Sequence, residues 1–376
     1  MTSGGRSVSG EAGASLDQAT LARRDPGGML RLVGETPRMM RSAWQLSRGL
    51  ELPDRHRQAR SVAVIGMGGS AAAGDLVRGI FGDRLRAPIV SVRDYDLPAW
   101  VGPDTLVVAA SHSGSTEETI SAFSAALSRR CPAVVISSGG PLAQVASRVG
   151  LPSLVYANES QPRAALGYGL VLLAGLLERA GLLDLAEEEV EAAARAAESI
   201  IEANQPSVPT DDNRAKQLAW SLVGRLPVVE ASGYLAPVAR RWKTQLNENA
   251  KSGALAEELP EATHNTVVGY EHPDTVRDHL YVILLSSALE HPRNARRATI
   301  STQLLNAAGI AHELVPLAGE GRLGQAASAI VLGDYVSVYL ALLYGVDPTP
   351  VEAIDVVKAG MSDEPNEDDD WRSSGG

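Results

Sequence analysis

The segment Ser111–Thr119 (SHSGSTEET) has four hydroxyl side chains in its first six residues, and a predicted buried strand passes into a predicted helix there. The first turn of a helix has backbone N–H groups without intrahelical partners. Ser111, Ser113 and Thr116 can converge with these groups around a phosphate. A capping box of Ser115 and Glu118 is the simpler alternative, but it needs only one hydroxyl. The lysine of a nucleotide P-loop is missing, which favours a sugar phosphate over ATP as the ligand.

A second candidate segment, Gly66–Gly74 (GMGGSAAAG), follows the first predicted strand. Its glycines would let the backbone approach an anionic ligand, with Gly69 and Ser70 at the start of a helix. Two alternatives stay open. The pattern is also a loose dinucleotide fingerprint, with Asp94 as the acid that should follow about 20 residues on, and it is equally typical of a tight turn without a ligand.

The elements around these segments indicate an α/β protein. Short apolar runs predict strands, and helical patterns such as 117–129 lie between several of them; the predicted strands cover residues 61–65, 87–92, 105–110, 133–136 and 153–156. Strands that alternate with helices predict a parallel sheet with helices on both faces. The second half repeats this order, with strands at 226–233, 281–285 and 311–316 and helices at 237–249 and 294–308. We therefore expect a duplicated fold.

Further helical patterns cover residues 29–50, 167–177, 183–204 and 351–359. The predicted organisation is a flexible segment at 1–24, a first domain with leading helices at 25–205, a second domain at 206–346, and a terminal helix with a disordered acidic tail at 347–376. The linker is placed at 206–212 (PSVPTDD).

Composition limits the function classes. The chain has 34 Lys+Arg and 45 Asp+Glu, a net charge of −11, and one cysteine, Cys131. Without a basic stretch it does not suit nucleic acid, whose binding needs neutralised phosphates. The longest apolar stretch found, 167–177, is well short of the roughly 20 residues of a membrane span. No apolar leader is evident, so the cytoplasm is the expected location.

Six segments together resemble one family. SVAVIGMGGSAAAGDL and SHSGSTEET are similar to the sugar isomerase (SIS) domain. QPRAALGYGL, RRWKTQLNENAKS, HNTVVGYE and DPTPVEAIDVVK narrow the likeness to the bifunctional phosphoglucose/phosphomannose isomerases, enzymes with two SIS domains. The resemblance runs from about residue 25 to residue 361.

The resemblance implies a role for each matching residue. Ser111, Ser113 and Thr116, with Gly69 and Ser70, would hold the substrate phosphate. Four residues would act on the sugar: Glu248 as the base between C1 and C2, His264 in ring opening, Arg163 on the enediolate, and Lys358 by reaching the sugar. His264 would come from the neighbouring subunit of a homodimer, and Thr349 would affect tolerance of both C2 epimers.

Each of these residues also has a simpler interpretation. Glu248 could pair with Arg240, Arg241, Lys243 or Lys251 on a solvated helix face. His264 could be a surface histidine, Arg163 a structural clamp, and Lys358 part of an exposed helix face. The chain also departs from the usual family pattern at Ala71, His112 and Ser115, although the hydroxyl groups are retained.

The implied reaction is the interconversion of glucose 6-phosphate or mannose 6-phosphate with fructose 6-phosphate through a cis-enediol, with no metal and no cofactor. The alternative from another class is a sensor that binds sugar phosphates without turnover. A zinc-dependent isomerase is disfavoured because no H-E-x-x-H or Cys/His cluster is present. A glucosamine-phosphate synthase is rejected because it requires an N-terminal cysteine, and an NAD-dependent dehydrogenase rests only on the loose glycine match.

Overall fold

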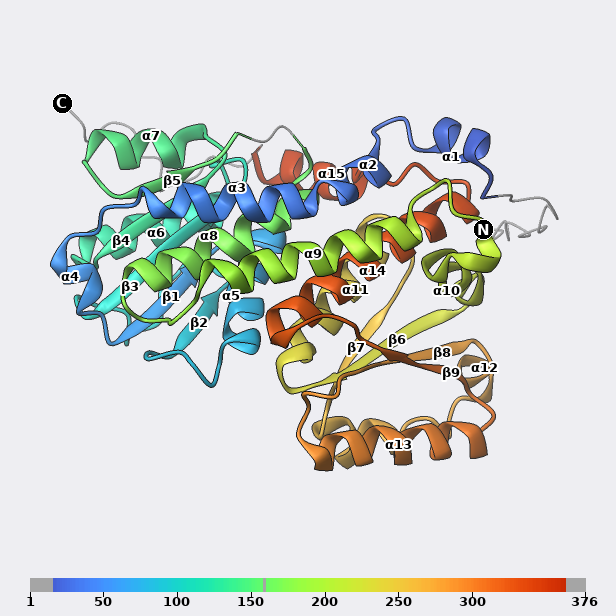
Figure 1. The fold of residues 1–376 in the computed structure, drawn as a ribbon. Helices are drawn as coiled ribbons and strands as arrows, with labels where there is room; N and C mark the ends of the chain where they lie inside the picture. The colour runs from blue at the N-terminus through green and yellow to red at the C-terminus, as the bar shows by residue number, and fades with distance from the viewer. Residues whose placement is uncertain (1–15, 158–159, 363–376) are drawn as a thin grey trace.

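The computed structural model describes residues 16–157 and 160–362, and contains two parallel sheets with helices around them (Figure 1). The predicted acidic tail lies outside the described residues, as do residues 1–15 of the predicted flexible segment. Residues 18–24 of that segment form a helix, α1 (Gln18–Arg24). Asp17 caps it by accepting a hydrogen bond from the Thr20 N–H, and Leu21 is buried.

The first sheet has the strand order β2-β1-β3-β4-β5, and every neighbouring pair is parallel. Its strands are β1 (Ser61–Ile65), β2 (Ile89–Val92), β3 (Thr105–Ser111), β4 (Ala133–Ser137) and β5 (Ser153–Val155). Successive side chains point to opposite faces of a strand. Ala63 and Ile65 therefore belong to one core beneath α6 and α7, whereas Val62 and Val64 face α5 and α8 in a larger core. A sheet buried on both faces explains the continuous apolar runs of the sequence.

The second sheet repeats this arrangement in four strands, in the order β7-β6-β8-β9 and again all parallel. Its strands are β6 (Leu226–Ser232), β7 (Leu255–Leu259), β8 (Leu280–Ser286) and β9 (Ala311–Pro316). The sheet lies between α13 on one face and α11 with α14 on the other (Figure 1). The expected duplication of fold is therefore present.

Sequence patterns located several helices to within about four residues, at 117–129, 167–177, 183–204, 237–249, 294–308 and 351–359, and gave no helix at residues 54–57, 140–148, 214–222 or 274–277. The bounds of the helices are α2 (Met29–Gly34), α3 (Thr36–Arg48), α4 (Asp54–Arg57), α5 (Gly68–Ile80), α6 (Glu117–Ser128), α7 (Gly140–Arg148), α8 (Leu166–Arg179), α9 (Glu187–Asn204), α10 (Arg214–Leu222), α11 (Ala236–Glu248), α12 (Asp274–Arg277), α13 (Pro292–Ala307), α14 (Gly321–Leu343) and α15 (Glu352–Ser362).

The prediction of one helix over 29–50 is wrong, because the chain is interrupted at Glu35 between α2 and α3. Pro37 lies in the first turn of α3, where its missing N–H costs no hydrogen bond. The Thr36 hydroxyl donates to the carbonyl of Val33 across the interruption.

Sequence analysis missed β7 and α14. Strand β7 is an edge strand with two glutamates, Glu257 and Glu258, and lacks the apolar run of a central strand. Helix α14 has 23 residues and a mean hydropathy of 1.7 over its most apolar window, which is enough for a membrane span by length and composition. The expectation that no stretch is long enough was therefore wrong, but the whole of that window is buried inside the protein.

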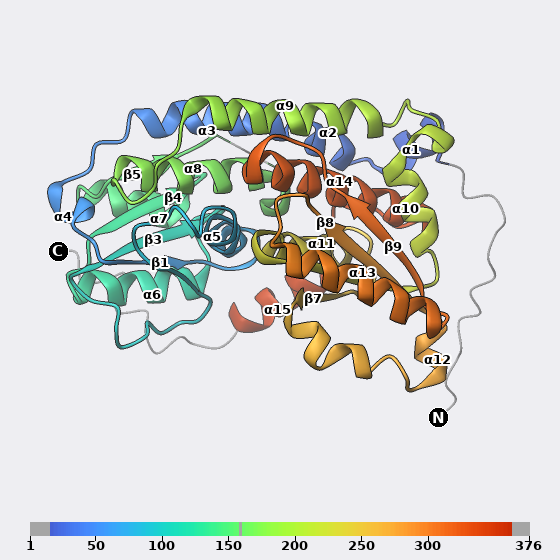
Figure 2. The ribbon, with the colours of Figure 1, turned by 60° about the horizontal axis from the view of Figure 1, so that its bottom comes forward.

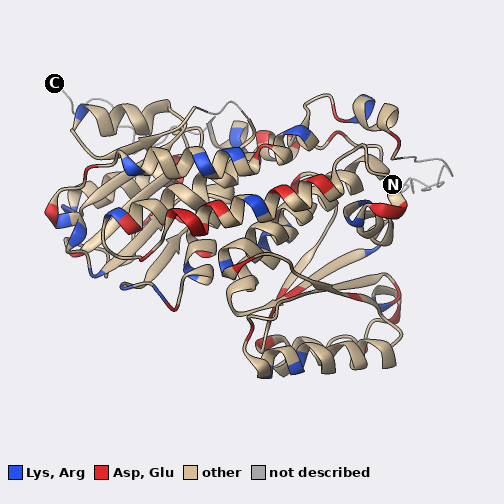
Figure 3. Cartoon of the chain, in the orientation of Figure 1, with Lys and Arg blue, Asp and Glu red and all other residues tan. Residues whose placement is uncertain are grey.

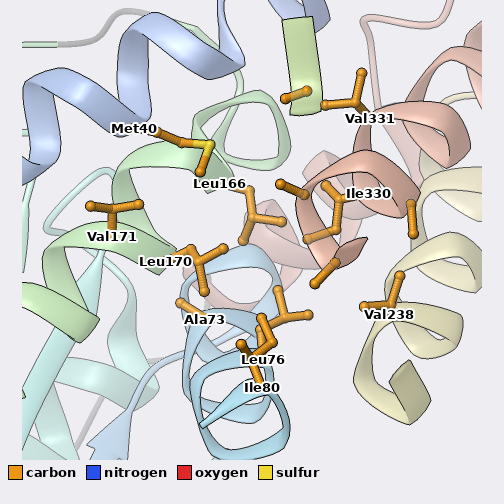
Figure 4. Close-up of a cluster of buried hydrophobic side chains, with 14 of the residues drawn as sticks. Met40, Ala73, Leu76, Ile80, Leu166, Leu170, Val171, Val238, Ile330 and Val331 are labelled. Atoms are coloured by element: carbon orange, nitrogen blue, oxygen red, sulfur yellow. The ribbon is translucent and has the colours of Figure 1, made fainter. Parts of the chain in front are cut away.

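Helix α14 connects the two halves of the molecule. It contacts α9 and α10 on one side and α11 on another, and α9 runs alongside α3 in both views (Figures 1 and 2). Close to the junction, apolar side chains from five helices interdigitate (Figure 4), among them Met40, Leu76, Leu170, Val238 and Ile330. The α3–α9 contact also carries charge: Arg41 of α3 pairs with both Glu191 and Glu198 of α9. Figure 3 shows basic positions on α3 and acidic positions on the neighbouring α9.

Candidate active site

The four hydroxyls of the Ser111–Thr116 segment form a compact loop between β3 and α6. Ser111 is buried at the carboxyl end of β3, and its Oγ lies 2.8 Å from Oγ1 of Thr116 and accepts the N–H of Gly114 at 3.1 Å. The exposed Ser113 hydroxyl accepts from the N–H and the hydroxyl of Ser115. Thr116 is the N-cap residue of α6, but its hydroxyl makes no capping bond. The capping box of Ser115 and Glu118 is therefore absent, and the hydroxyls bond to one another beside the helix N-terminus.

Backbone contacts fix the shape of this hydroxyl loop. Gly114 has φ +68°, and a Cβ there would lie 2.0 Å from the carbonyl oxygen of Gly139. The loop carbonyl of Gly114 accepts the N–H of Leu142, and that of His112 accepts the N–H of Ser138. The hydroxyl loop therefore packs directly against the turn between β4 and α7, and the contact leaves room only for glycine at residue 114.

The glycine segment after β1 adjoins both the end of β3 and the turn that carries Arg163. A Cβ on Gly66 would be 2.6 Å from the carbonyl oxygen of Ala110, the residue before Ser111. A Cβ on Gly69 would be 3.3 Å from the carbonyl oxygen of Pro162. Ser70 is half-buried in the first turn of α5. The first turn of α5 therefore touches both β3 and the segment that carries Arg163.

Arg163 is the most constrained charged residue of the site. It lies in a 3-10 turn, η1 (Pro162–Ala165), and is 2 % exposed. Its Nε donates to Oδ1 of Asn249 at 2.7 Å, and its Nη2 donates to the carbonyls of Pro348 and Thr349 at 2.7 and 2.6 Å. These hydrogen bonds make Arg163 a structural clamp, as the simpler interpretation proposed. Arg163 joins the first half of the chain to the end of α11 and to the segment before α15.

Glu248 ends α11 and faces Arg163, with 3.7 Å between its Oε2 and Nη1 of Arg163. Its side chain is 28 % exposed and lines a cavity of ≈ 670 Å³ together with Lys251, Asp347, Glu352 and Ile354. The simpler alternative, an ion pair with Arg240, Arg241, Lys243 or Lys251, is not among the ion pairs of the described residues. The partner of Glu248 comes from the other half of the chain, and its carboxylate borders open space.

Two residues next to Glu248 were missed as parts of the site. Asn249 is fully buried between Arg163 and Ser337, whose hydroxyl accepts from its Nδ2 at 2.9 Å. Lys251 has φ +53°, and its Nζ donates to the carbonyls of Glu248 and Asp347, both at 2.9 Å. Both lie in the NENAK segment that singled out Glu248, but a sequence gives no sign of which neighbour turns inward.

The site contains both cationic and acidic side chains: Arg163 faces Glu248, and Lys251 lines the cavity together with Asp347 and Glu352. Burial lowers the pKa of the Arg163 guanidinium, and burial together with Arg163 lowers that of Lys251. Behind Arg163 lies a second buried pair, in which Arg241 Nη2 is 3.1 Å from Asp334 and also donates to the carbonyl of Arg163. Burial raises the pKa of the Asp334 carboxyl. A negative charge that develops near Glu248 would meet these fixed cations.

Thr349 and Lys358 are placed differently from one another. The carbonyl of Thr349 accepts from Arg163, while its hydroxyl is buried against Gly27, where a Cβ would approach it to 2.1 Å. Lys358 lies at an exposed position of α15, whose first residues line the cavity. Thr349 therefore belongs to the Arg163 cluster through its backbone, and Lys358 lies beyond the rim of the cavity.

His264 is not brought to the other candidate residues within this chain. It ends a 3-10 turn, η4 (Glu261–His264), that follows β7 in the second sheet, and it is exposed. None of the hydrogen bonds or ion pairs found within residues 16–157 and 160–362 joins it to Arg163 or Glu248. Over these same ranges, no three His, Cys, Asp or Glu side chains gather in a way that could hold a metal ion.

Two parallel sheets, a hydroxyl loop at a helix N-terminus and an Arg–Glu pair beside a cavity define a two-sheet α/β protein of the SIS fold. A hypothetical protein of Thermus thermophilus, TT0462, shares this fold with a TM-score of 0.72 over 92 % of this chain and 93 % of that one, at 17 % identity. Residues 211–361 match the family described as the bacterial phospho-glucose isomerase C-terminal SIS domain.

The chain belongs to the bifunctional phosphoglucose/phosphomannose isomerase family. It is 35 % identical to the enzyme of that name from Caldicellulosiruptor bescii, over 89 % of this chain and 99 % of the relative. It is 33 % identical to the Aquifex aeolicus enzyme, over 80 % and 89 % of the two chains. The resemblance seen in the sequence motifs is confirmed.

Proposed function

We propose that this protein interconverts glucose 6-phosphate and mannose 6-phosphate with fructose 6-phosphate by proton transfer through a cis-enediol, without a metal. The observation that carries the proposal is the pairing of Glu248 with Arg163 at 3.7 Å beside the ≈ 670 Å³ cavity. The membership of the family supports the substrates. The turn at Pro162 that carries Arg163 adjoins Gly69, in the same glycine segment whose Gly66 adjoins Ala110, the residue before Ser111.

The substrate phosphate is held by the hydroxyls of Ser111, Ser113 and Thr116 and by free N–H groups at the start of α6, with Gly69 and Ser70 of α5 beside them. Two of these hydroxyls already lie 2.8 Å apart. An anion there also meets the positive end of the α6 dipole. Binding of the phosphate far from C1 and C2 orients the open-chain sugar for reaction.

Glu248 takes the proton from C2 of the aldose and returns it to C1. The C2–H bond breaks, its electrons form the C1–C2 double bond of the enediolate, and negative charge appears on O1. A proton then passes from O2 to O1, so that protonation of C1 leaves the carbonyl at C2. Arg163 is fixed by Asn249 and two carbonyls before the reaction begins. Such a preorganised cation stabilises charge that develops only in the transition state.

His264, Lys358 and Thr349 complete the proposed site. His264 is exposed in this chain and assists ring opening in the site of a neighbouring subunit, so the proposed active unit is a homodimer. Lys358 reaches the sugar from α15, and Thr349 sets the tolerance of the two epimers through the Arg163 cluster. The cytoplasm and the domain limits 25–205 and 206–346 stay predictions.

The deciding experiment measures turnover of fructose 6-phosphate to each aldose in EDTA, with Glu248→Gln and a matched control, Glu258→Gln. Glu258 is exposed on β7 and lies outside the proposed site. We expect wild type and Glu258→Gln to form both aldoses, and Glu248→Gln to lose at least about a hundredfold in kcat, the usual contribution of a positioned base.

Two results would contradict the proposal. Wild type that binds the sugar phosphates but turns neither over would favour a sensor that binds without catalysis. Wild-type turnover that is equally fast in Glu248→Gln would exclude Glu248 as the base.

A further inference from the structure

A buried glutamate in the second sheet has no counterpart in the first sheet. Glu230 lies on β6, is 3 % exposed, and accepts a hydrogen bond from the Tyr270 hydroxyl at 2.7 Å. Within the described part of the chain, its other carboxylate oxygen, Oε2, has no hydrogen-bond partner. Burial raises the pKa of this carboxyl, and Glu257 raises it further.

Comparison of strand register in the two sheets identifies the residue of the first sheet that occupies the same position as Glu230. Glu230 pairs with Leu284, two residues before the terminal Ser286 of β8. In the first sheet, Ile65 pairs with Ala109, which is likewise two residues before the terminal Ser111 of β3. Ile65 is packed in the apolar core under α6 and α7. The same sheet position can therefore be filled by an aliphatic side chain.

Burial of a carboxylate lowers the stability of a fold unless its hydrogen bonds are satisfied, and one oxygen of Glu230 has no partner among the described residues. A gain in stability therefore does not explain a glutamate at this position. What it contacts is the segment after β7 that contains His264. Tyr270 packs its ring against the apolar cluster below the sheet and directs its hydroxyl to Glu230.

Two further hydrogen bonds hold the same segment. The Thr266 hydroxyl donates to Oε2 of Glu257 at 2.9 Å, and Glu257 is the register partner of Glu230 on β7. Arg297 of α13 donates to the Thr263 hydroxyl at 2.7 Å. His264 thus lies between anchored residues, while its own side chain stays exposed.

We propose that Glu230 and Tyr270 are positioning residues that hold the His264 loop, residues 261–270, on the edge of the second sheet. They fix the direction in which the exposed imidazole is presented to the sugar. The effect on turnover rests on the role proposed above for His264, whereas the effect on the loop does not.

The test compares variants that remove the hydrogen bond with variants that keep it or remove a similar one elsewhere. Tyr270→Phe and Glu230→Ile both remove the hydrogen bond between the two side chains; isoleucine is the residue that the first sheet has at the matching position. Glu230→Gln keeps an oxygen that accepts from the tyrosine. Tyr281→Phe is the matched control, because the Tyr281 hydroxyl donates to Glu313 at 3.1 Å between β8 and β9, away from the His264 loop. Amide hydrogen exchange of residues 261–270 is measured together with kcat and KM for fructose 6-phosphate.

We expect Tyr270→Phe and Glu230→Ile to speed exchange in residues 261–270 by about tenfold, as for a locally opened segment. Their kcat should fall by about tenfold with KM within about twofold, since a misplaced acid–base group affects the chemical step. Glu230→Gln and Tyr281→Phe should resemble wild type in both measurements.

Unchanged exchange in Tyr270→Phe would overturn the proposal, and this variant decides the matter if Glu230→Ile does not fold. Faster exchange with unchanged kcat would show that the loop is held but that its position does not serve the reaction. If wild type itself has no isomerase activity, the proposed function fails, and exchange alone still decides whether Glu230 and Tyr270 hold the loop.

Discussion

At the scale of single residues, the proposed site depends on charged side chains that several hydrogen bonds hold in place. Arg163 uses its whole guanidinium: Nε and Nη2 are fixed by Asn249 and two carbonyls, and Nη1 faces Glu248. The fork of arginine allows this, whereas a lysine has one nitrogen and could not replace it. The same residue is therefore both a structural clamp and the cation nearest to the proposed base.

The hydroxyl loop makes a prediction about binding. Ser111→Ala removes the buried hydroxyl that contacts Thr116, and we expect KM for fructose 6-phosphate to rise by about tenfold with a smaller change in kcat, because one hydrogen bond to a charged group contributes about 1.5–3 kcal/mol. Steady-state kinetics measure both constants.

Ser61→Ala is the matched control for Ser111→Ala. The Ser61 hydroxyl lies 3.0 Å from Oγ1 of Thr105, in a similar pair at the opposite end of β1 and β3. Its KM should stay at the wild-type value. An equal rise in both variants would indicate general damage to the sheet, not loss of a phosphate contact.

At the scale of elements, the site is made where strands of a parallel sheet end and helices begin. Crossover helices place the carboxyl ends of β1 and β3 side by side, so that the first turns of α5 and α6 converge. The contacts at Gly66, Gly69 and Gly114 show how closely these turns approach. Such approaches depend on glycine, because a side chain would separate the backbones.

Gly114→Ala tests this dependence. A Cβ at residue 114 would lie 2.0 Å from the carbonyl oxygen of Gly139, so the loop must shift. We expect KM to rise by more than about tenfold, because a displaced loop loses hydroxyl contacts that each contribute about 1.5–3 kcal/mol.

Gly150→Ala separates this contact from the cost of a positive φ. Gly150 has φ +67° and nothing within 4 Å of an added Cβ, so that variant should lose stability without losing affinity. Equal KM values for the two variants would contradict the proposed close fit of the loop.

At the scale of the whole molecule, α14 packs against helices of both halves, and Arg163 of the first half is hydrogen-bonded to residues of the second. Besides Arg163 and Glu248, the proposed site uses His264 from a second copy of the chain. If so, equimolar Glu248→Gln and His264→Ala chains, mixed under conditions that allow subunit exchange, form hybrid dimers with one site that has both native residues. About a quarter of wild-type activity should appear, since half the dimers are hybrid and each has one intact site of two.

Each variant assayed alone is the control for the hybrid dimer, and should be nearly inactive. No recovery of activity, with exchange of subunits verified by mass, would show that His264 does not act across a subunit boundary.

Stability should depend on pH through His56, which is fully buried and lies with Nε2 3.1 Å from the carbonyl of Ala133. Burial lowers the pKa of this imidazole below its ordinary value of 6.5. Below pH 6.5 the unfolded chain therefore binds a proton that the folded chain does not, so this contribution is complete above pH 6.5 and is lost as the pH falls toward the folded-state pKa.

Urea unfolding at pH 7, 6 and 5 measures this contribution as the difference between wild type and His56→Gln. We expect wild-type stability to fall more steeply below pH 6.5 than that of the variant, by about 1.4 kcal/mol for each unit by which the pKa is lowered. The same comparison with His272→Gln, at an exposed histidine, is the control for the general effect of removing a histidine. Parallel curves for wild type and His56→Gln would contradict the prediction.

The sequence by itself determined the α/β class, most strand positions and the hydroxyl loop. Each of these follows from local physics: apolar runs of four to seven residues favour buried strands, and clustered hydroxyls beside a helix start favour an anion. The family resemblance then assigned Glu248 and Arg163, and the structure placed them together.

Only the tertiary structure decided what surrounds these residues. Asn249, Pro348 and Thr349 reach Arg163 from positions far along the chain, and Glu230 meets Tyr270 from another element. Helix α14 was overlooked for the same reason: it is apolar all round, so it lacks an amphipathic period, and the elements that bury it come from both halves. Periodicity reports one face of one element, whereas these contacts exist only when separate elements are packed together.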